Sequence, residues 1–222
     1  EGRWIHLSGS VFADFDRGMH ICPIVHDPTY PVIAAVDPGY RRPAVLYAQE
    51  IKWCSVHNAG NCIHILDEDL PDNCPTIKLA RIMSQRYRRE NWRRGPVYID
   101  PAGASRSVQV GWSDIELIEA EGFNNVIFTT DPADRFIPAG IEVIRGKLKN
   151  AAGRTSLYIS DALEGNKRGI IAALTRSEYP EKKANGHIDD NPIKDGEIDH
   201  IRVALRYMLV NLYPIGGRVN IA

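Results

Sequence analysis

The sequence predicts an α/β fold in which a mixed β-sheet carries helices on both faces. Residues 32–36, VIAAV, are apolar at every position, as in a strand that is covered on both sides. More β-prone runs follow before the first long amphipathic pattern, and strands and helices alternate after it. The chain has 222 residues, 44% of them hydrophobic, which suits one domain with a sizeable core.

Three strands are expected at the start of the sheet. They are residues 32–36, the run AVLYAQEIKW at 44–53 and the run NCIHIL at 61–66. A helix is expected from Thr76 to about residue 90, because apolar residues there are spaced as one buried stripe. The stripe consists of Ile77, Ala80, Met83 and Tyr87. Residues 97–100 form the fourth expected strand.

Helices and strands alternate in the second half of the chain. The expected order is a helix from Ser107, a strand at 125–130, a helix at 141–148, a short extended run at 156–160 and a helix at 162–174. The inward residues of the first of these helices are Val108, Trp112, Ile115 and Ile118.

The last helix has the clearest apolar stripe and ends at Pro214. The stripe consists of Ile198, Ile201, Leu205, Met208 and Leu212. Three strands, a helix and then alternating strands and helices are the order of elements in the ribonuclease H-like fold.

The chain is expected to have two parts, a linker segment at 1–30 and the folded domain at 31–222. Because it begins with Glu1 and its opening has no long apolar run, we expect a piece of a longer intracellular protein without a signal peptide or membrane span. The four cysteines lack the short spacing of a structural zinc site, which favours reduced thiols. The formal net charge is only −1, so any polyanion has to be bound by a local surface.

Two aspartates stand at the ends of expected strands. Asp37 ends the first strand in AVDPGY, and Asp100 ends the fourth in YIDPAG. The proline that follows each aspartate holds it in an extended conformation, and a glycine then lets the chain turn away. Each carboxylate therefore faces the crevice at the strand ends, where open α/β sheets bind ligands.

If these strands are parallel neighbours, the two carboxylates lie side by side and repel each other unless a proton or a cation intervenes. Carboxylate oxygens suit Mg²⁺ or Mn²⁺, and a pair of such ions roughly 3.5–4 Å apart can stabilise both the attacking and the leaving oxygen of a phosphodiester displacement. The alternative is that each aspartate only caps a turn, since Asp-Pro-Gly is a common turn sequence.

Three motifs together resemble the nuclease domain of bacteriophage large terminase subunits. They are AVDPGY at 35–40, YIDPAGASR at 98–106 and DHIRVALRY at 199–207. The resemblance implies a ribonuclease H-like fold and two-metal cleavage of double-stranded, concatemeric DNA with little sequence specificity. It also implies an N-terminal packaging ATPase, for which this chain has no GxxxxGK[ST] motif, and a portal and a small terminase subunit as partners in the host cell cytoplasm.

By the same resemblance, Asp37, Asp100 and Asp199 are the catalytic metal ligands. Val203 stands where family members often have a second aspartate in the last helix. Spacing alone supports a different role for Asp199, which is favourable near a helix N-terminus and close to Arg202 one turn on. Asp195 and Glu197 are the substitutes for Asp199 as the third acid, and His200 is either a ligand or proton carrier or a packing residue.

Several arginines are candidates for contact with DNA phosphates. Arg41 and Arg42 follow the first aspartate, and the basic run RYRRENWRR at 86–94 mixes arginines with aromatic residues, although such a run is also typical of a solvated helix end. The candidates are Arg41, Arg42, Arg106, Arg202 and Arg206, with Arg88, Arg89, Arg93 and Arg94 from the basic run.

Three other functions stay open at this point. Another ribonuclease H-like nuclease, such as a Holliday-junction resolvase, would prefer branched DNA. A sugar-kinase or actin-like ATPase domain would also place Asp-x-Gly after its first strand, but it needs a later glycine-rich phosphate loop, and GGR at 216–218 follows the last helix. A nuclease-like domain that has lost activity and only docks partners is the third, and Val203 keeps it open.

Overall fold

A seven-stranded mixed sheet forms the centre of the computed structural model, which describes residues 9–54, 59–101, 111–181 and 190–215. The strand order is β1-β7-β4-β3-β2-β5-β6. The strands are β1 (Ile21–Cys22), β2 (Val32–Asp37), β3 (Ala44–Cys54), β4 (Ala59–Asp69), β5 (Arg94–Ile99), β6 (Val126–Ile127) and β7 (Leu157–Ser160).

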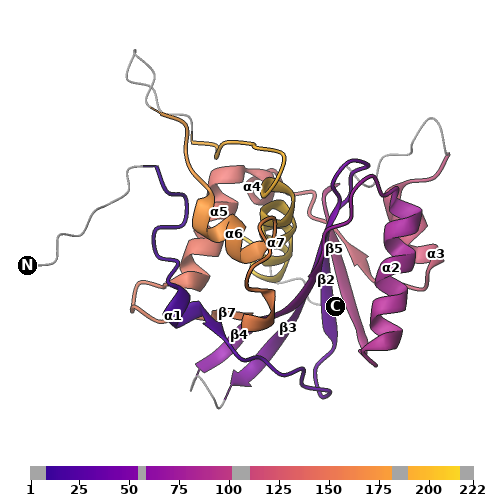
Figure 1. Ribbon diagram of the computed structural model, residues 1–222, viewed down its shortest axis with the longest axis horizontal. Helices are drawn as coiled ribbons and strands as arrows, with labels where there is room; N and C mark the ends of the chain where they lie inside the picture. The colour runs from indigo at the N-terminus through magenta and orange to yellow at the C-terminus, as the bar shows by residue number, and fades with distance from the viewer. Residues whose placement is uncertain (1–8, 55–58, 102–110, 182–189, 216–222) are drawn as a thin grey trace, which may run out of the picture.

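Helices cover both faces of this sheet (Figure 1). They are α1 (Arg17–His20), α2 (Thr76–Arg89), α3 (Asp114–Ala120), α4 (Pro132–Arg135), α5 (Ile137–Leu148), α6 (Ile170–Arg176) and α7 (Asp199–Leu212), with a 3-10 turn, η2, at Asp161–Leu163. Figure 1 shows α2 and α3 on one face and α5, α6 and α7 on the other. The predicted fold class, a ribonuclease H-like mixed sheet between two helical layers, is confirmed.

Side chains along β2 alternate between the two faces of the sheet and contribute to the hydrophobic core on each face. Val32, Ala34 and Val36 pack toward α2 and α3, while Ile33 and Ala35 pack toward α5, α6 and α7. All five are buried, which explains why this strand is apolar at every position. Burial of apolar area on both faces stabilises the sheet by about 25 cal/mol per Å².

The pairing of β2 determines where the strand-end aspartates lie. β2 is antiparallel to β3 and parallel to β5, and Val36 stands opposite Ile99 in the parallel pair. The next residues along the two strands are Asp37 and Asp100, so both carboxylates leave the sheet at the same edge. The strand pairing thus satisfies the condition on which the predicted site depends.

The described part of the expected linker segment packs onto the domain. Val11 and Phe12 are buried in the core beneath α5 and α6, and β1 adds a strand parallel to β7. Asp16 caps α1 by accepting a hydrogen bond of 2.9 Å from the N–H of Met19. The boundary at residue 31 between linker and domain stays a prediction.

Two details of the predicted helices are wrong. In the described residues, α3 begins at Asp114, because Ser113 and Glu116 form a capping box there and Gly111 has a φ of +73°. Trp112, expected to face inward, is therefore 50% exposed. The expected helix start at Ser107 and the expected inward residue Val108 lie outside the described residues. In α2, Leu79 occupies the buried stripe, and Ile77 is 40% exposed.

No helix in the described part of the chain is long and apolar enough to cross a membrane.

The C-terminal end of β4 carries a buried acid. Glu68 accepts hydrogen bonds from the amide of Asn166 at 2.7 Å and from the backbone N–H of Ile170 at 2.8 Å. Burial raises the pKa of Glu68 to about 7, against the effect of these two hydrogen bonds. The carboxyl group connects β4 to the loop before α6.

We predict that this carboxyl group makes stability depend on pH. Because its pKa is about 7 in the folded protein and 4.5 without the fold, the folded protein binds the proton more tightly. The free energy of unfolding should fall between about pH 4.5 and pH 7 and level off above it. Urea unfolding of the wild type and Glu68→Gln across this range checks it, since the variant should lack this part of the decline. Parallel stability curves would contradict it.

Candidate active site

A cavity of about 330 Å³ lies at the edge of the sheet where β2 and β5 end. Its acidic lining consists of Asp37, Asp100 and Asp199, and its basic lining consists of Lys194, His200, Arg202 and Arg206. Three isoleucines of α5 form an apolar part of the wall, namely Ile137, Ile141 and Ile144. Three acids from distant parts of the sequence therefore line one partly open cavity.

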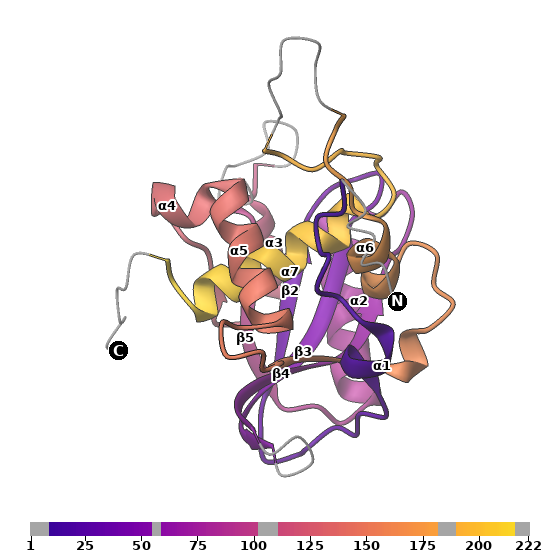
Figure 2. The same cartoon turned by 90° about the vertical axis from the view of Figure 1, so that its left-hand side faces the viewer.

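Helix α7 brings the third acid to this edge. It packs against β2, β3 and β5 and lies between α5 and α6 (Figure 2). The predicted stripe residues Ile201, Leu205 and Met208 are buried beneath it, as expected. Asp199 belongs to the first turn of the helix, so burial of the stripe fixes this turn above the ends of β2 and β5.

Asp37 is held by the imidazole of His200. The Nδ1 atom of His200 lies 2.7 Å from Oδ2 of Asp37, whose side chain is only 13% exposed. Burial raises the pKa of Asp37, and the charges of Asp100 and Asp199 act in the same direction, while the hydrogen bond from His200 opposes them. The same hydrogen bond raises the pKa of His200.

Asp199 is the most strongly buried of the three acids. It is 9% exposed, and its Oδ1 atom has no hydrogen-bond partner among the described residues. A buried carboxylate oxygen without a partner is costly, so this atom is suited to a cation or a ligand. The N-terminal end of α7 lies beside it and carries a partial positive charge that offsets part of the cost.

Asp195, the predicted substitute ligand, already has a structural role. Its Oδ1 atom accepts hydrogen bonds from the backbone N–H groups of Glu197 at 2.8 Å and Ile198 at 3.0 Å. Burial acts to raise the pKa of Asp195, but these two N–H groups and the Asp199 side chain lower it below its usual range. Asp195 therefore stabilises the turn that leads into α7.

Val203 lines the cavity at the position where the resembling family often has a second aspartate. Within the described ranges, no three His, Cys, Asp or Glu side chains come close enough together to hold a metal ion. The donor chemistry of Asp37, Asp100 and Asp199 fits a divalent cation, and the unpartnered oxygen of Asp199 supports that fit. Their described positions around the cavity do not form a closed ligand cluster.

Arg202 and Arg206 are buried in the cavity wall. Arg202 donates to Oγ of Ser177 at 2.9 Å, and burial lowers the pKa of its guanidinium, against the effect of Asp199 and Asp195. Arg206 lies 4.3 Å from the centre of the Tyr207 ring and donates to the carbonyl of Arg135 at 3.3 Å. The two guanidinium groups supply positive charge opposite the acids.

Gly140 makes room for Arg206. A Cβ atom at Gly140 would lie 2.7 Å from Cγ of Arg206, closer than side chains tolerate. The glycine lets α5 approach α7 closely, so that Arg206 passes between the two helices toward the cavity.

The other predicted DNA-contacting arginines lie in different places. Arg41 and Arg42 belong to the turn after Asp37, where Arg41 is exposed and Arg42 forms ion pairs with Asp72 and Glu197. Arg106 lies outside the described residues. The arginines of the basic run lie near the start of β5, whereas Asp100 follows the end of this strand. At 3.3 Å per residue, the length of β5 separates these arginines from Asp100 by roughly 20 Å. They are Arg88, Arg89, Arg93 and Arg94.

Sequence reasoning missed two side chains at the cavity. Lys194 lines it from the polar loop before α7, a segment without any periodic pattern that could have placed it. Tyr207 lines it too and donates a hydrogen bond to Asp100. Helical periodicity could have predicted Tyr207, because it follows Val203 by four residues and Val203 follows His200 by three, which places all three on one face of α7.

Comparison of structures shows the same fold in phage large terminases. The large terminase of one thermophilic bacteriophage superposes with a TM-score of 0.67 and 19% identity over 95% of this chain and 47% of its own. The large terminase nuclease of thermophilic phage G20c gives 0.60 and 13% identity over 92% of this chain and 99% of its own. The nuclease domain of bacteriophage SPP1 with bound Mn gives 0.52 and 14% identity, covering 87% and 96%.

At the level of sequence, no family model and no curated protein matches the chain. The likeness is therefore one of fold: this chain has the ribonuclease H-like architecture, and within it the form found in the nuclease domains of phage large terminases. The chain spans about half the length of the first of these terminases and nearly the whole of the isolated nuclease domains.

We predict that Asp199→Asn has opposite effects on stability without metal and on metal binding. In chelator, the variant should be as stable as the wild type or more so, because it removes repulsion from Asp37. In Mn²⁺ the free energy of unfolding of the wild type should rise with ion concentration, by about 2.7 kcal/mol at one hundred times Kd, and its melting temperature should rise with it. The variant should gain less. Thermal melts with and without Mn²⁺ measure this. An equal gain in both proteins would exclude Asp199 from the ion site.

Proposed function

We propose that this chain is the nuclease domain of a phage DNA-packaging terminase and cuts double-stranded DNA in a metal-dependent reaction. The observation that supports it most directly is the meeting of Asp37, Asp100 and Asp199 in one cavity at the ends of parallel strands. The fold agrees with it, because the similar domains are terminase nucleases. Structures of those domains hold Mn, Co or Mg, which supports a divalent cation here as well.

The three carboxylates are the proposed ligands of Mg²⁺ or Mn²⁺, with two ions in the complete site. When bound, such ions lower the pKa of coordinated water and offset the charge of a phosphodiester. His200 keeps Asp37 in place, and Tyr207 does the same for Asp100. Lys194, which lines the cavity from the loop before α7, is the proposed contact for an incoming phosphate.

The charged groups of the cavity wall support a role in phosphate recognition. Arg202 and Arg206 donate to hydroxyl and carbonyl oxygens among the described residues, and these neutral partners leave their positive charge available to a bound phosphate. The isoleucines of α5 reduce the access of water, which strengthens each of these electrostatic interactions. Sequence specificity should be slight, because phosphate contacts carry no base information.

The wider setting is part of the same proposal. Since the chain spans about half of a similar phage large terminase, we place a packaging ATPase in the remainder of the natural protein. Double-stranded DNA is the substrate, the portal and the small terminase subunit are further partners, and the host cell cytoplasm is the place of action.

An inactive docking domain is the second candidate. Val203 in the cavity wall and the absence of a closed three-ligand cluster among the described residues favour it. Cleavage assays separate the two candidates directly.

We predict that the domain nicks and degrades plasmid and linear DNA in Mn²⁺ or Mg²⁺ and is inactive in excess chelator. Asp37→Asn and Asp100→Asn should each reduce the rate by about 10²-fold or more, equivalent to about 2.7 kcal/mol of transition-state stabilisation. Gel assays with purified variants of normal melting temperature measure this. Cleavage that resists chelator would refute the mechanism, and a silent wild type would support the docking domain.

A second DNA contact is proposed at the opposite end of the sheet. A depression of about 560 Å³ is lined by Arg93, Arg94, Asn124 and Asn125. The guanidinium groups of Arg93 and Arg94 bind the carbonyls of Thr29 and Glu121, and in the described part of the chain no carboxylate pairs with them. Their uncompensated charge suits a DNA phosphate.

We predict that Arg93→Gln combined with Arg94→Gln weakens DNA binding and lowers its dependence on salt. The slope of log K against log salt should fall by about 2, because each phosphate contact contributes about 0.9. Binding titrations at several salt concentrations measure this slope. Arg17→Gln, which removes an exposed arginine paired with Glu164, is the control. If both proteins lose the same slope, the depression is not a specific contact.

A further inference from the structure

The first turn of α7 has no ordinary N-cap. The capping position is Ile198, whose side chain makes no capping hydrogen bond. Instead, the chain enters the helix through a turn in which Asp195 accepts the N–H groups of Glu197 and Ile198. Gly196 has a φ of +70° there, a conformation that favours glycine. The position of Asp199 and His200 thus depends on what holds this turn.

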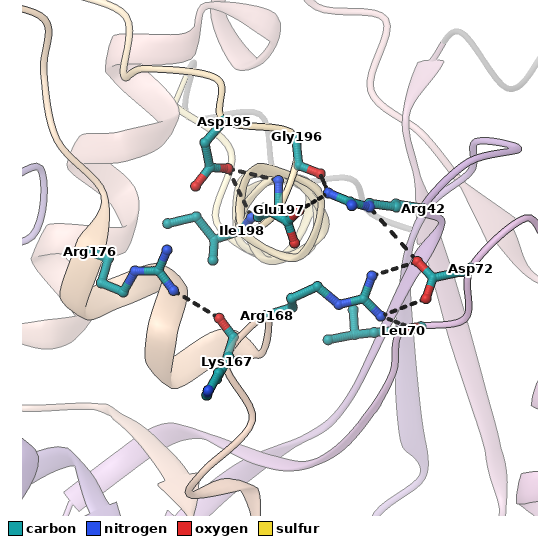
Figure 3. A network of polar contacts seen from close by, with 10 residues as sticks. All are labelled: Arg42, Leu70, Asp72, Lys167, Arg168, Arg176, Asp195, Gly196, Glu197 and Ile198. Atoms are coloured by element: carbon teal, nitrogen blue, oxygen red, sulfur yellow. Dashed lines mark hydrogen bonds and ion pairs between the residues drawn. The ribbon is translucent and has the colours of Figure 1, made fainter.

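The guanidinium of Arg42 holds this turn in place. It comes from the connection between β2 and β3, five residues after Asp37, and its Nη1 atom donates to the carbonyl of Gly196 and pairs with the carboxylate of Glu197 (Figure 3). Its Nε atom lies 3.8 Å from Oδ1 of Asp72. One guanidinium therefore connects the turn before α7 to the loop between β4 and α2.

The anchor on the Asp72 side is itself fixed. Arg168 binds both oxygens of Asp72, at 2.6 and 3.2 Å, and donates to the carbonyl of Leu70 at 3.0 Å (Figure 3). The backbone N–H groups of Asn73 and Cys74 donate to the carbonyls of Arg41 and Tyr40, both at 2.8 Å. These contacts join the loop after β4 to the turn after β2 and so fix the backbone next to Arg42.

The charges within this network balance. Arg42 and Arg168 face Asp72 and Glu197, two cations against two carboxylates. The network as a whole is therefore neutral and attracts a DNA phosphate only weakly. The side chains of Arg42, Glu197 and Asp72 are 37%, 41% and 55% exposed, so each pair alone is weak and the effect comes from the shared geometry.

We propose that Arg42 is a positioning residue that fixes the first turn of α7 and thereby places Asp199 and His200 opposite Asp37 and Asp100. The proposal rests on the proposed nuclease function for its effect on catalysis, and on the contacts above for its effect on the helix. It differs from the DNA contact that the sequence suggests for Arg42. A displacement of catalytic ligands by about 1 Å lowers the rate by up to about 10²-fold, so a contact that fixes the first turn of α7 affects the rate of cleavage.

The test compares Arg42→Gln and Glu197→Gln with Arg81→Gln. The control removes an exposed arginine that pairs with one carboxylate, Glu121, at 3.2 Å on the far face of the sheet. Hydrogen exchange is measured in chelator for the amides of residues 202–205, the first to donate within α7. Mn²⁺ affinity, kcat at saturating DNA and the salt slope of DNA binding are measured on the same proteins.

The proposal expects about tenfold faster exchange at these amides, about tenfold weaker Mn²⁺ binding and about tenfold lower kcat in both network variants, with an unchanged salt slope. The double variant Arg42→Gln with Glu197→Gln should be no worse than Arg42→Gln alone, because that single variant already loses the ion pair with Glu197 together with the hydrogen bond to Gly196. The control should keep wild-type values.

A salt slope reduced by about 1 in Arg42→Gln, with exchange and Mn²⁺ affinity unchanged, would overturn the proposal in favour of a direct phosphate contact. Exchange that is unchanged in both network variants would overturn it as well. If the wild type does not cleave DNA but exchange responds as expected, the nuclease proposal fails while the positioning of α7 by Arg42 stands. Hydrogen exchange thus separates the two failures.

Discussion

Repulsion between Asp37, Asp100 and Asp199 around one cavity is the constraint to which the surrounding structure responds. Taking three carboxylates out of water costs free energy unless hydrogen bonds, protons or cations compensate them. His200 compensates Asp37 at 2.7 Å, Tyr207 donates to Asp100, and the N-terminus of α7 faces Asp199, which still leaves Oδ1 of that residue without a described partner. Compensation by the described residues is therefore incomplete, which is the state expected of a site that a cation completes.

The packing of the domain maintains this unfavourable arrangement. β2 and β5 are parallel, and after a register shift between Val32 and Ala34 they pair regularly up to Val36 and Ile99, so their following acids leave the sheet together. The buried stripe of α7 prevents the third acid from moving away, because release of the first turn would expose apolar area. At the far side, Gly140 allows α5 and α7 to approach closely enough to enclose the cavity. The packing of the core thus fixes the positions of the three acids.

Much of this could be predicted from the sequence, because the relevant signals are local. The apolar run before Asp37, the prolines after both strand-end aspartates and the stripe of the last helix each depend on neighbouring residues. What could not be predicted depends on contacts between distant segments. The hydrogen bond of Arg42 to Gly196 spans 154 residues, and no pattern near Arg42 distinguishes it from an exposed phosphate ligand. The pairing of β1 with β7 involves two residues of each strand, too few for a periodic signal. The exposure of Trp112 was missed because the apolar spacing took precedence over the capping box of Ser113 and Glu116, which starts α3 after Trp112.

The most direct test of the account is anomalous diffraction from crystals of the domain soaked in Mn²⁺. The account predicts anomalous density in the cavity at the ends of β2 and β5, with carboxylate oxygens of Asp37, Asp100 and Asp199 at ligand distance and Asp195 still bound to the backbone of Glu197. Density bound by other residues, or by Asp37 and Asp100 with Asp199 turned away, would contradict the central claim that these three acids form one metal site.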